Sequence, residues 1–61
     1  MSRALEKTIR EMIARDLRVL ADDEYIDADQ QGEMTALADR MENGTASEVD
    51  WIEALQQITL A

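Results

Sequence analysis

Apolar residues recur at intervals of three and four along the first 21 residues of this chain. They are Leu5, Ile9, Met12, Ile13, Leu17 and Leu20. Because an α-helix turns once in 3.6 residues, this spacing places them on one stripe of a helix. β-branched residues never alternate over a run as they do in strands, and proline is absent. We therefore predict an all-α protein.

The pattern predicts three helices, approximately over residues 3–21, 28–43 and 47–59, in one small domain that covers residues 1–61. The connection before the third helix is only three or four residues long. A connection this short favours antiparallel neighbours, so we expect a helix followed by a helical hairpin.

Local sequence signals mark the ends of these helices. Ser2 can cap the first helix, and Asp27, followed by a glutamine three residues later, can cap the second. Gly44 can end the second helix, because glycine accepts the left-handed conformation that helix ends commonly need. Thr45 and Ser47 each begin a capping pattern, so we expect the third helix to begin at one of them.

The predicted core is formed by the apolar stripes of the three helices. Its members are Leu5, Ile9, Ile13, Leu17, Leu20, Met34, Leu37, Met41, Trp51, Ile52, Leu55 and Ile58. In a core this small, truncating Leu37 or Leu55 to alanine should cost about 2–5 kcal/mol of stability.

Asp16 lies at an angle that places it within the apolar stripe of the first helix. Two interpretations remain open. Either Asp16 lies at an exposed end of the seam or pairs with Arg40, or it makes a buried polar contact that fixes the helix register.

Charge is unevenly distributed along the chain. Residues 1–21 hold five cations and three carboxylates, or about +2, whereas residues 22–61 hold one cation and eleven carboxylates, or about −10. The net charge is −8. Such a field repels nucleic acid and membrane surfaces and attracts basic protein surfaces.

Residue types exclude several kinds of chemistry. Histidine and cysteine are absent, which removes disulfides, thiolate catalysis and ordinary zinc sites. The segment that begins at Asp27 resembles the start of a calcium-binding loop, but Gln31 and Ala38 occupy positions that need ligating oxygens. We therefore expect no enzyme activity, no cofactor and no metal.

The charge pattern also disfavours a DNA-binding helix-turn-helix domain. The third helix would carry Glu48, Asp50 and Glu53 without a cation, so DNA phosphates would repel it. No apolar run follows the N-terminus, so we expect no signal peptide and no transmembrane span. Together with the missing cysteine, this predicts a cytoplasmic protein.

The acidic surface is the strongest candidate for function. We expect its residues to act through their charge rather than as acids or bases. They are Asp22, Asp23, Glu24, Asp27, Asp29, Asp39, Glu42, Asp50 and Glu53. Such a surface can imitate the charge spacing of a nucleic-acid backbone and occupy a lysine- and arginine-lined groove.

In its small size, its acidity and its lack of a catalytic constellation, the whole chain resembles the small phage-encoded inhibitor proteins, which include anti-CRISPR proteins and DNA mimics. The resemblance lies in general character and involves no signature motif. It implies binding to a host defence complex or nucleic-acid-handling enzyme in the host cytoplasm.

Two functions follow as hypotheses. The first is a non-enzymatic inhibitor that docks its acidic surface on the basic, nucleic-acid-binding groove of a larger protein. The alternative is a structural or assembly module that binds through apolar helix faces, while the charge only keeps it dissolved. Monomer and homodimer both remain open, since the basic helix could meet the acidic helices of a second copy.

Overall fold

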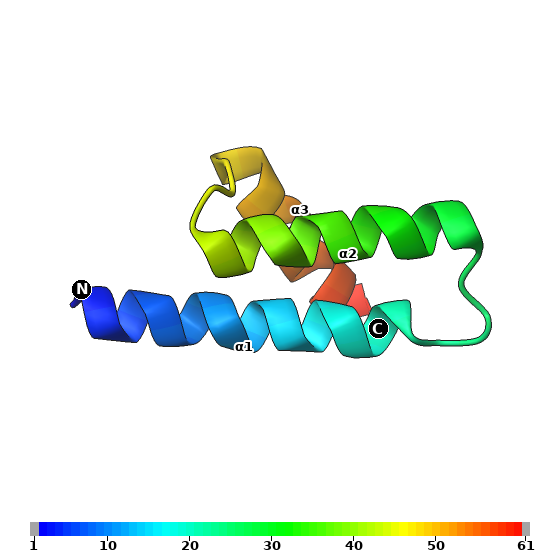
Figure 1. Cartoon of the computed structure of the whole chain (residues 1–61), viewed down its shortest axis with the longest axis horizontal. Helices are drawn as coiled ribbons and strands as arrows, with labels where there is room; N and C mark the ends of the chain where they lie inside the picture. Colours follow the sequence, from blue (N-terminus) through cyan, green and yellow to red (C-terminus); the bar gives the residue numbers. More distant parts are fainter. Residues whose placement is uncertain (1, 61) are drawn as a thin grey trace.

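The computed structural model describes residues 2–60, which form three α-helices (Figure 1). α1 spans Arg3–Ala21, α2 spans Ala28–Asn43 and α3 spans Glu48–Leu60. No strand occurs among these residues, so the all-α prediction is confirmed. The predicted bounds of the first two helices are correct, and the third begins and ends one residue later than predicted. Over the described range, no helix combines the length and the apolar character needed to cross a membrane.

Side-chain hydrogen bonds fix the starts of α1 and α2. Ser2 Oγ accepts the N–H of Leu5 at 3.1 Å, and Asp27 Oδ1 accepts the N–H of Gln30 at 2.7 Å. These N–H groups have no partner within the first turn of a helix, which is why both predicted caps form. The predicted end of α2 is also confirmed, because Gly44 adopts the left-handed conformation with φ 76°.

α3 uses the second of its two capping patterns. Ser47 Oγ accepts the N–H of Asp50 at 3.2 Å, and Asp50 Oδ2 accepts the N–H of Ser47 at 3.0 Å. This exchange is a capping box in which aspartate replaces the usual glutamate. A start at Thr45 is wrong, because the N–H of Thr45 donates to the carbonyl of Arg40 at 2.9 Å and belongs to the end of α2.

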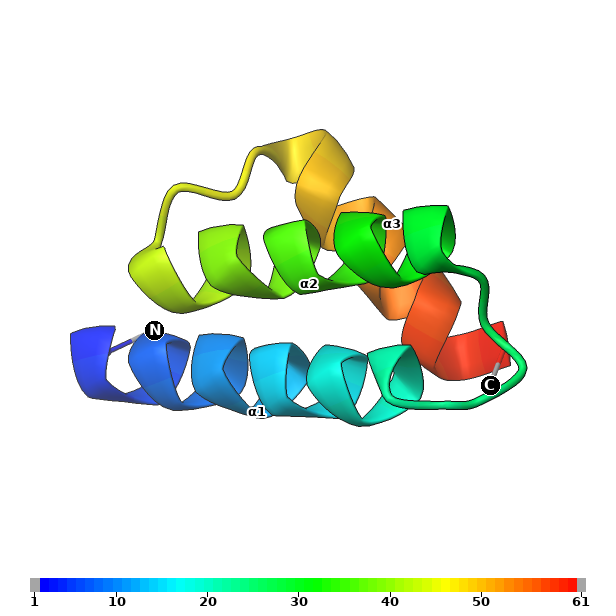
Figure 2. The same cartoon turned by 45° about the vertical axis from the view of Figure 1, so that its right-hand side comes forward.

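α1 and α2 lie side by side and antiparallel, and α3 crosses over them (Figures 1 and 2). A short turn joins α2 to α3, and α3 contacts both other helices. This arrangement is consistent with a helix followed by a hairpin, although the most extensive packing is between α1 and α2. The molecule measures 37 × 16 × 16 Å and is elongated along these two helices.

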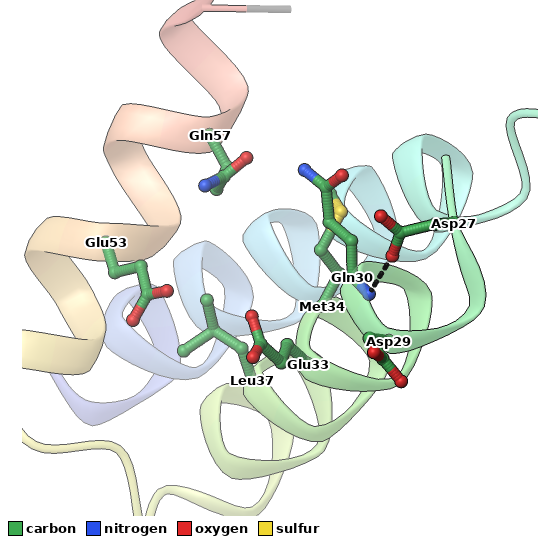
Figure 3. Close-up of a pocket in the computed structure, with 8 residues that line it drawn as sticks. All are labelled: Asp27, Asp29, Gln30, Glu33, Met34, Leu37, Glu53 and Gln57. Atoms are coloured by element: carbon green, nitrogen blue, oxygen red, sulfur yellow. Dashed lines mark hydrogen bonds between the residues drawn. The ribbon is translucent and has the colours of Figure 1, made fainter. Parts of the chain in front are cut away.

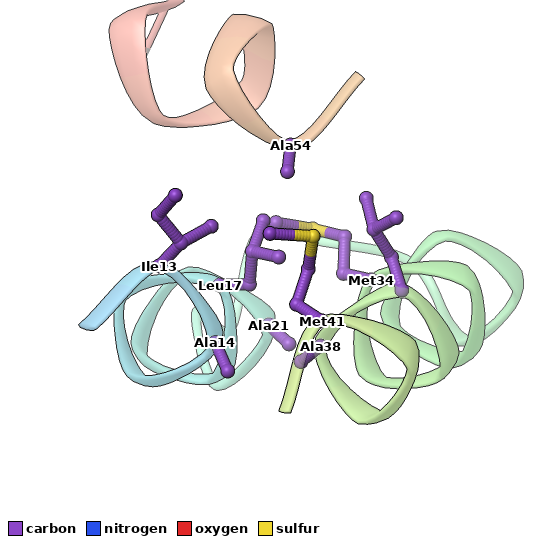
Figure 4. Close-up of a cluster of buried hydrophobic side chains, with 9 residues drawn as sticks. Ile13, Ala14, Leu17, Ala21, Met34, Ala38, Met41 and Ala54 are labelled. Atoms are coloured by element: carbon purple, nitrogen blue, oxygen red, sulfur yellow. The ribbon is translucent and has the colours of Figure 1, made fainter. Parts of the chain in front are cut away.

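The core lies where the three helices meet (Figure 4). Its buried side chains are Ile13, Ala14, Leu17, Ala21, Met34, Leu37, Ala38, Met41 and Ala54. Leu17 of α1 and Met41 of α2 are the largest that are fully buried. The alanines allow close approach of the helices, because the distance between packed helices depends on the side chains at the contact.

The predicted core is wrong for two residues of α3, Ile52 and Leu55, which are exposed. α3 instead faces the core through Ala54, with Trp51 and Ile58 partly buried beside it. These three residues are spaced by three and four and share a face of the helix. The small alanine at the centre of this face lets α3 lie close to α1 and α2, which leaves the larger aliphatic side chains outside.

Two expectations for α1 are also corrected. Leu5 is 51% exposed, because it lies about 120° around the helix from the buried Leu17. Asp16 is exposed, which agrees with the first interpretation and rules out a buried contact that fixes register. The predicted pairing of Asp16 with Arg40 is wrong as well, since Arg40 binds Asp50 of α3.

Truncation of Leu37 and of Leu55 to alanine should now have different effects. Leu37 is 2% exposed, so its loss should leave a cavity and cost about 2–5 kcal/mol. Leu55 is 49% exposed, so its loss should cost less than about 1.5 kcal/mol. Urea unfolding followed by circular dichroism measures both values. Equal losses of unfolding free energy in the two variants would contradict the exposure of Leu55 on α3.

The two glycines should respond to alanine substitution with opposite signs. At Gly44, an alanine would take a left-handed φ, and its Cβ would lie 2.6 Å from Nη1 of Arg10. The Arg10 side chain can move, but the backbone strain remains, so Gly44→Ala should destabilise by about 1–2 kcal/mol. Gly32→Ala is the matched control. It meets no atom within 4 Å and should stabilise α2 by about 0.5–1 kcal/mol. Thermal unfolding should show a lower Tm than the parent for Gly44→Ala and a higher Tm for Gly32→Ala.

Candidate functional site

The connection between α1 and α2 gathers the first group of predicted acidic residues at one end of the molecule. Asp22, Asp23 and Glu24 are exposed there. Asp23 Oδ1 accepts the N–H of Tyr25 at 2.9 Å, which holds the turn. Gln31 Nε2 donates to the carbonyl at the end of α1 at 2.9 Å and so fixes the connection to α2.

A second group lines an open hollow of about 310 Å³ between α2 and α3, which we call the acidic groove (Figure 3). Its lining consists of Asp27, Asp29, Gln30, Glu33, Met34, Leu37, Glu53 and Gln57. Four of these residues are carboxylates and none is a cation.

Helical spacing explains how the walls of the acidic groove form. Asp29 and Glu33 are four residues apart on α2, and Glu53 and Gln57 are four apart on α3, so each pair shares a face. Figure 3 shows the α3 pair facing the side of α2 that carries Glu33. Buried Met34 contributes an apolar part of the lining. The groove therefore combines apolar surface with negative charge, part of which is offset by Arg40, which lies beside Glu33 and Glu53 just outside the lining.

Two other predicted residues, Asp39 and Glu42, lie outside the acidic groove and contact α1. Arg18 Nη2 donates to Asp39 Oδ1 at 2.5 Å and to Glu42 Oε2 at 3.1 Å. Both carboxylates stay about half exposed. One cation of α1 thus partly neutralises two carboxylates of α2, and this contact helps to join the helices.

Asp50 is engaged more completely than any other predicted residue. Arg40 donates to it through Nε at 2.9 Å and through Nη2 at 3.2 Å, and its side chain is only 17% exposed. Hydrogen bonding from Arg40, followed by the N–H of Ser47, lowers the pKa of Asp50. The hydrogen bond to Asp50 likewise raises the pKa of Arg40. This bidentate pair fixes α3 against α2.

The structure therefore separates the predicted residues by environment. Asp27, Asp29 and Glu53 come together in the acidic groove, whereas Asp39, Glu42 and Asp50 are paired with arginines. Glu33 was not among the predicted site residues, although its spacing of four from Asp29 places both on one face of α2. Among residues 2–60, no group of three or more potential metal ligands is close enough to hold an ion.

No known protein family, curated protein sequence or solved structure matches this chain. The surface of the protein is therefore the source of any inference about its function. Its main features are the acidic groove between α2 and α3, the exposed carboxylates of the α1–α2 connection, and the cations of α1.

The pair of Arg40 and Asp50 should make stability depend on pH. Because the folded state lowers the pKa of Asp50 below its ordinary 3.8, the unfolded chain binds more protons in acid. The contribution is fully present above about pH 4–5 and is lost as pH falls through the lower, folded pKa. Asp50→Asn should therefore lower the Tm at pH 7, and the difference from the parent should shrink in strong acid. Glu24→Gln, on the exposed connection, is the control and should leave the Tm nearly unchanged at both pH values.

Proposed function

We propose that this protein is a non-enzymatic binding protein, an inhibitor that docks its acidic surface on the basic, nucleic-acid-binding groove of a larger protein. The observation that carries the proposal is the acidic groove, in which four carboxylates and no cation border apolar surface. The resemblance to small phage-encoded inhibitors supports the same function.

The acidic groove suits the side chains that line nucleic-acid-binding surfaces. Lysine and arginine have aliphatic stems that pack on apolar surface while their charged ends stay near water or carboxylates. Leu37 and Met34 lie at the apolar base of the groove with only 2% and 4% of their surface exposed, and Glu33 and Glu53 offer acceptors beside them. Charge-assisted hydrogen bonds between such groups are stronger than neutral ones.

The position of the cations favours binding through α2 and α3. Five of the six basic residues lie on α1, and Arg40, the other one, is bound to Asp50. A basic partner would therefore be attracted to the acidic groove and the neighbouring connection and repelled by the cations of α1. This asymmetry would also orient the approach of the partner, because fields of this kind steer association.

The assembly module stays as the second candidate, and exposed apolar residues favour it. Val49 and Ile52 are exposed on α3, three residues apart on one face. Apolar residues scattered singly on a surface need no explanation, but neighbours along one helix face can form part of an interface.

Capture of partners from a bacterial host lysate across a salt series separates the two functions. Docking through exposed charge should weaken steeply as salt rises, because a screening length of about 10 Å at 0.1 M falls further at higher salt. Excess duplex DNA should displace the captured protein if its nucleic-acid groove is occupied. Binding that survives high salt and is lost in Val49→Ser/Ile52→Ser would instead support the assembly module.

Neutralising the acidic groove should weaken this binding directly. The variant Asp29→Asn/Glu33→Gln/Glu53→Gln should lose roughly tenfold in affinity, because exposed charge pairs contribute about 0.2–1 kcal/mol each. The control Glu6→Gln/Asp16→Asn/Glu48→Gln makes the same change in net charge at exposed positions outside the groove. Titration calorimetry with the captured partner compares the affinities of the groove variant and the control variant. Equal losses would show that only net charge matters and would contradict docking through the acidic groove.

A further inference from the structure

α1 carries an exposed apolar stripe on the side away from the core. Leu5 and Met12 are each 51% exposed and Val19 is 67% exposed. These residues are seven apart, so they stay aligned along the helix with a drift of only about 20° per step. Met12 lies about 140° around the helix from buried Leu17, so none of the three belongs to the core of this chain.

We propose that this stripe pairs with the same stripe of a second copy of this chain, with the two α1 helices antiparallel and Met12 at the two-fold axis. The spacing is symmetric about Met12, since Leu5 precedes it by seven residues and Val19 follows it by seven. In the antiparallel register, Leu5 of one copy therefore lies across from Val19 of the other, and Met12 lies across from Met12. A two-fold interface of this kind uses the same patch on both chains.

Opposite charges beside the stripe favour a second copy as its occupant, because Glu11 and Arg15 both flank it and are both exposed. The net charge of residues 1–21, about +2, opposes pairing of two α1 helices far less than the charge of residues 22–61, about −10, would oppose pairing of the acidic helices. The exposed apolar residues of α3 are a less favourable site for pairing with a second copy. α3 carries Glu48, Asp50 and Glu53 and no cation, so pairing through α3 would place acidic residues against one another.

Charge also selects the antiparallel orientation. A parallel pair would bring together the two connections that hold Asp22, Asp23 and Glu24. The antiparallel pair instead places Asp22 of one copy at the level of Arg3 of the other, because both lie nine or ten residues from the axis at Met12. Arg3 lies about 180° around α1 from Met12, so the antiparallel arrangement separates the two acidic connections without adding an ion pair at its ends.

One ion pair is specific to the proposed register. Glu11 and Arg15 are exposed and flank the stripe on the same side of α1. A two-fold axis at Met12 places the side of the stripe that carries Glu11 and Arg15 next to the same side in the other copy. Arg15 of each copy therefore lies within reach of Glu11 of the other. The dimer would thus have two equivalent ion pairs beside Met12. The acidic groove lies on α2 and α3 and stays open in both copies.

Cross-linking tests the position of the axis. The natural chain has no cysteine, so Met12→Cys introduces a single thiol at the proposed centre. Oxidation should convert this variant to a disulfide-linked dimer at least tenfold faster than Ala36→Cys, whose thiol would lie on the exposed side of α2. Equal rates for the two variants would overturn the proposal.

Charge reversal tests the register. By sedimentation equilibrium, the parent protein should show a mass of twice 6.9 kDa at high concentration. Glu11→Arg and Arg15→Glu should each weaken dimerisation about tenfold, because each reversal places like charges together at both pairs. The double variant Glu11→Arg/Arg15→Glu should recover affinity to within about threefold of the parent. Circular dichroism checks that each variant keeps its helices. A parent that stays at 6.9 kDa, or a double variant no better than the single ones, would overturn the proposal.

Discussion

The close packing of α1 against α2 forms most of the core and creates the surface that receives α3. Leu17 and Met41 are fully buried in it, and Ala14 and Ala38 leave no exposed surface. Small residues at this contact bring the two helices near enough to exclude water from the larger side chains. α3 then needs only Ala54 and its partly buried neighbours to complete the core, since the surface that receives it already exists.

Ion pairs between helices supplement the apolar contacts where these contacts are small. The chain has one cation after residue 21, Arg40, and the structure uses it to bind Asp50 and so hold α3 on α2. Arg18 similarly joins α1 to two carboxylates of α2. These arginines bind Asp39, Glu42 and Asp50, and none of these three carboxylates lines the acidic groove. The carboxylates that join the helices are thus different residues from those that line the groove.

Much of the fold could be predicted from the sequence because its signals are local. The caps at Ser2 and Asp27 and the left-handed Gly44 involve residues within one helical turn of each other, and all three predictions are confirmed. The candidate site was predicted less completely. The charge of Asp29 and Glu53 is visible in the sequence, but their meeting in one groove with Glu33 depends on how α3 crosses α2.

The three helices, their ends to within one residue, and the division between a basic first helix and an acidic remainder follow from the amino-acid sequence alone. Periodicity, capping and charge are properties of short segments, so no knowledge of distant contacts is required. The amino-acid sequence does not show that Ala54, and not Leu55, faces the core, or that Arg40 binds Asp50. These outcomes depend on the angle and rotation at which α3 packs. A helix with apolar residues on more than one side, such as α3, does not specify them until it meets the other two helices.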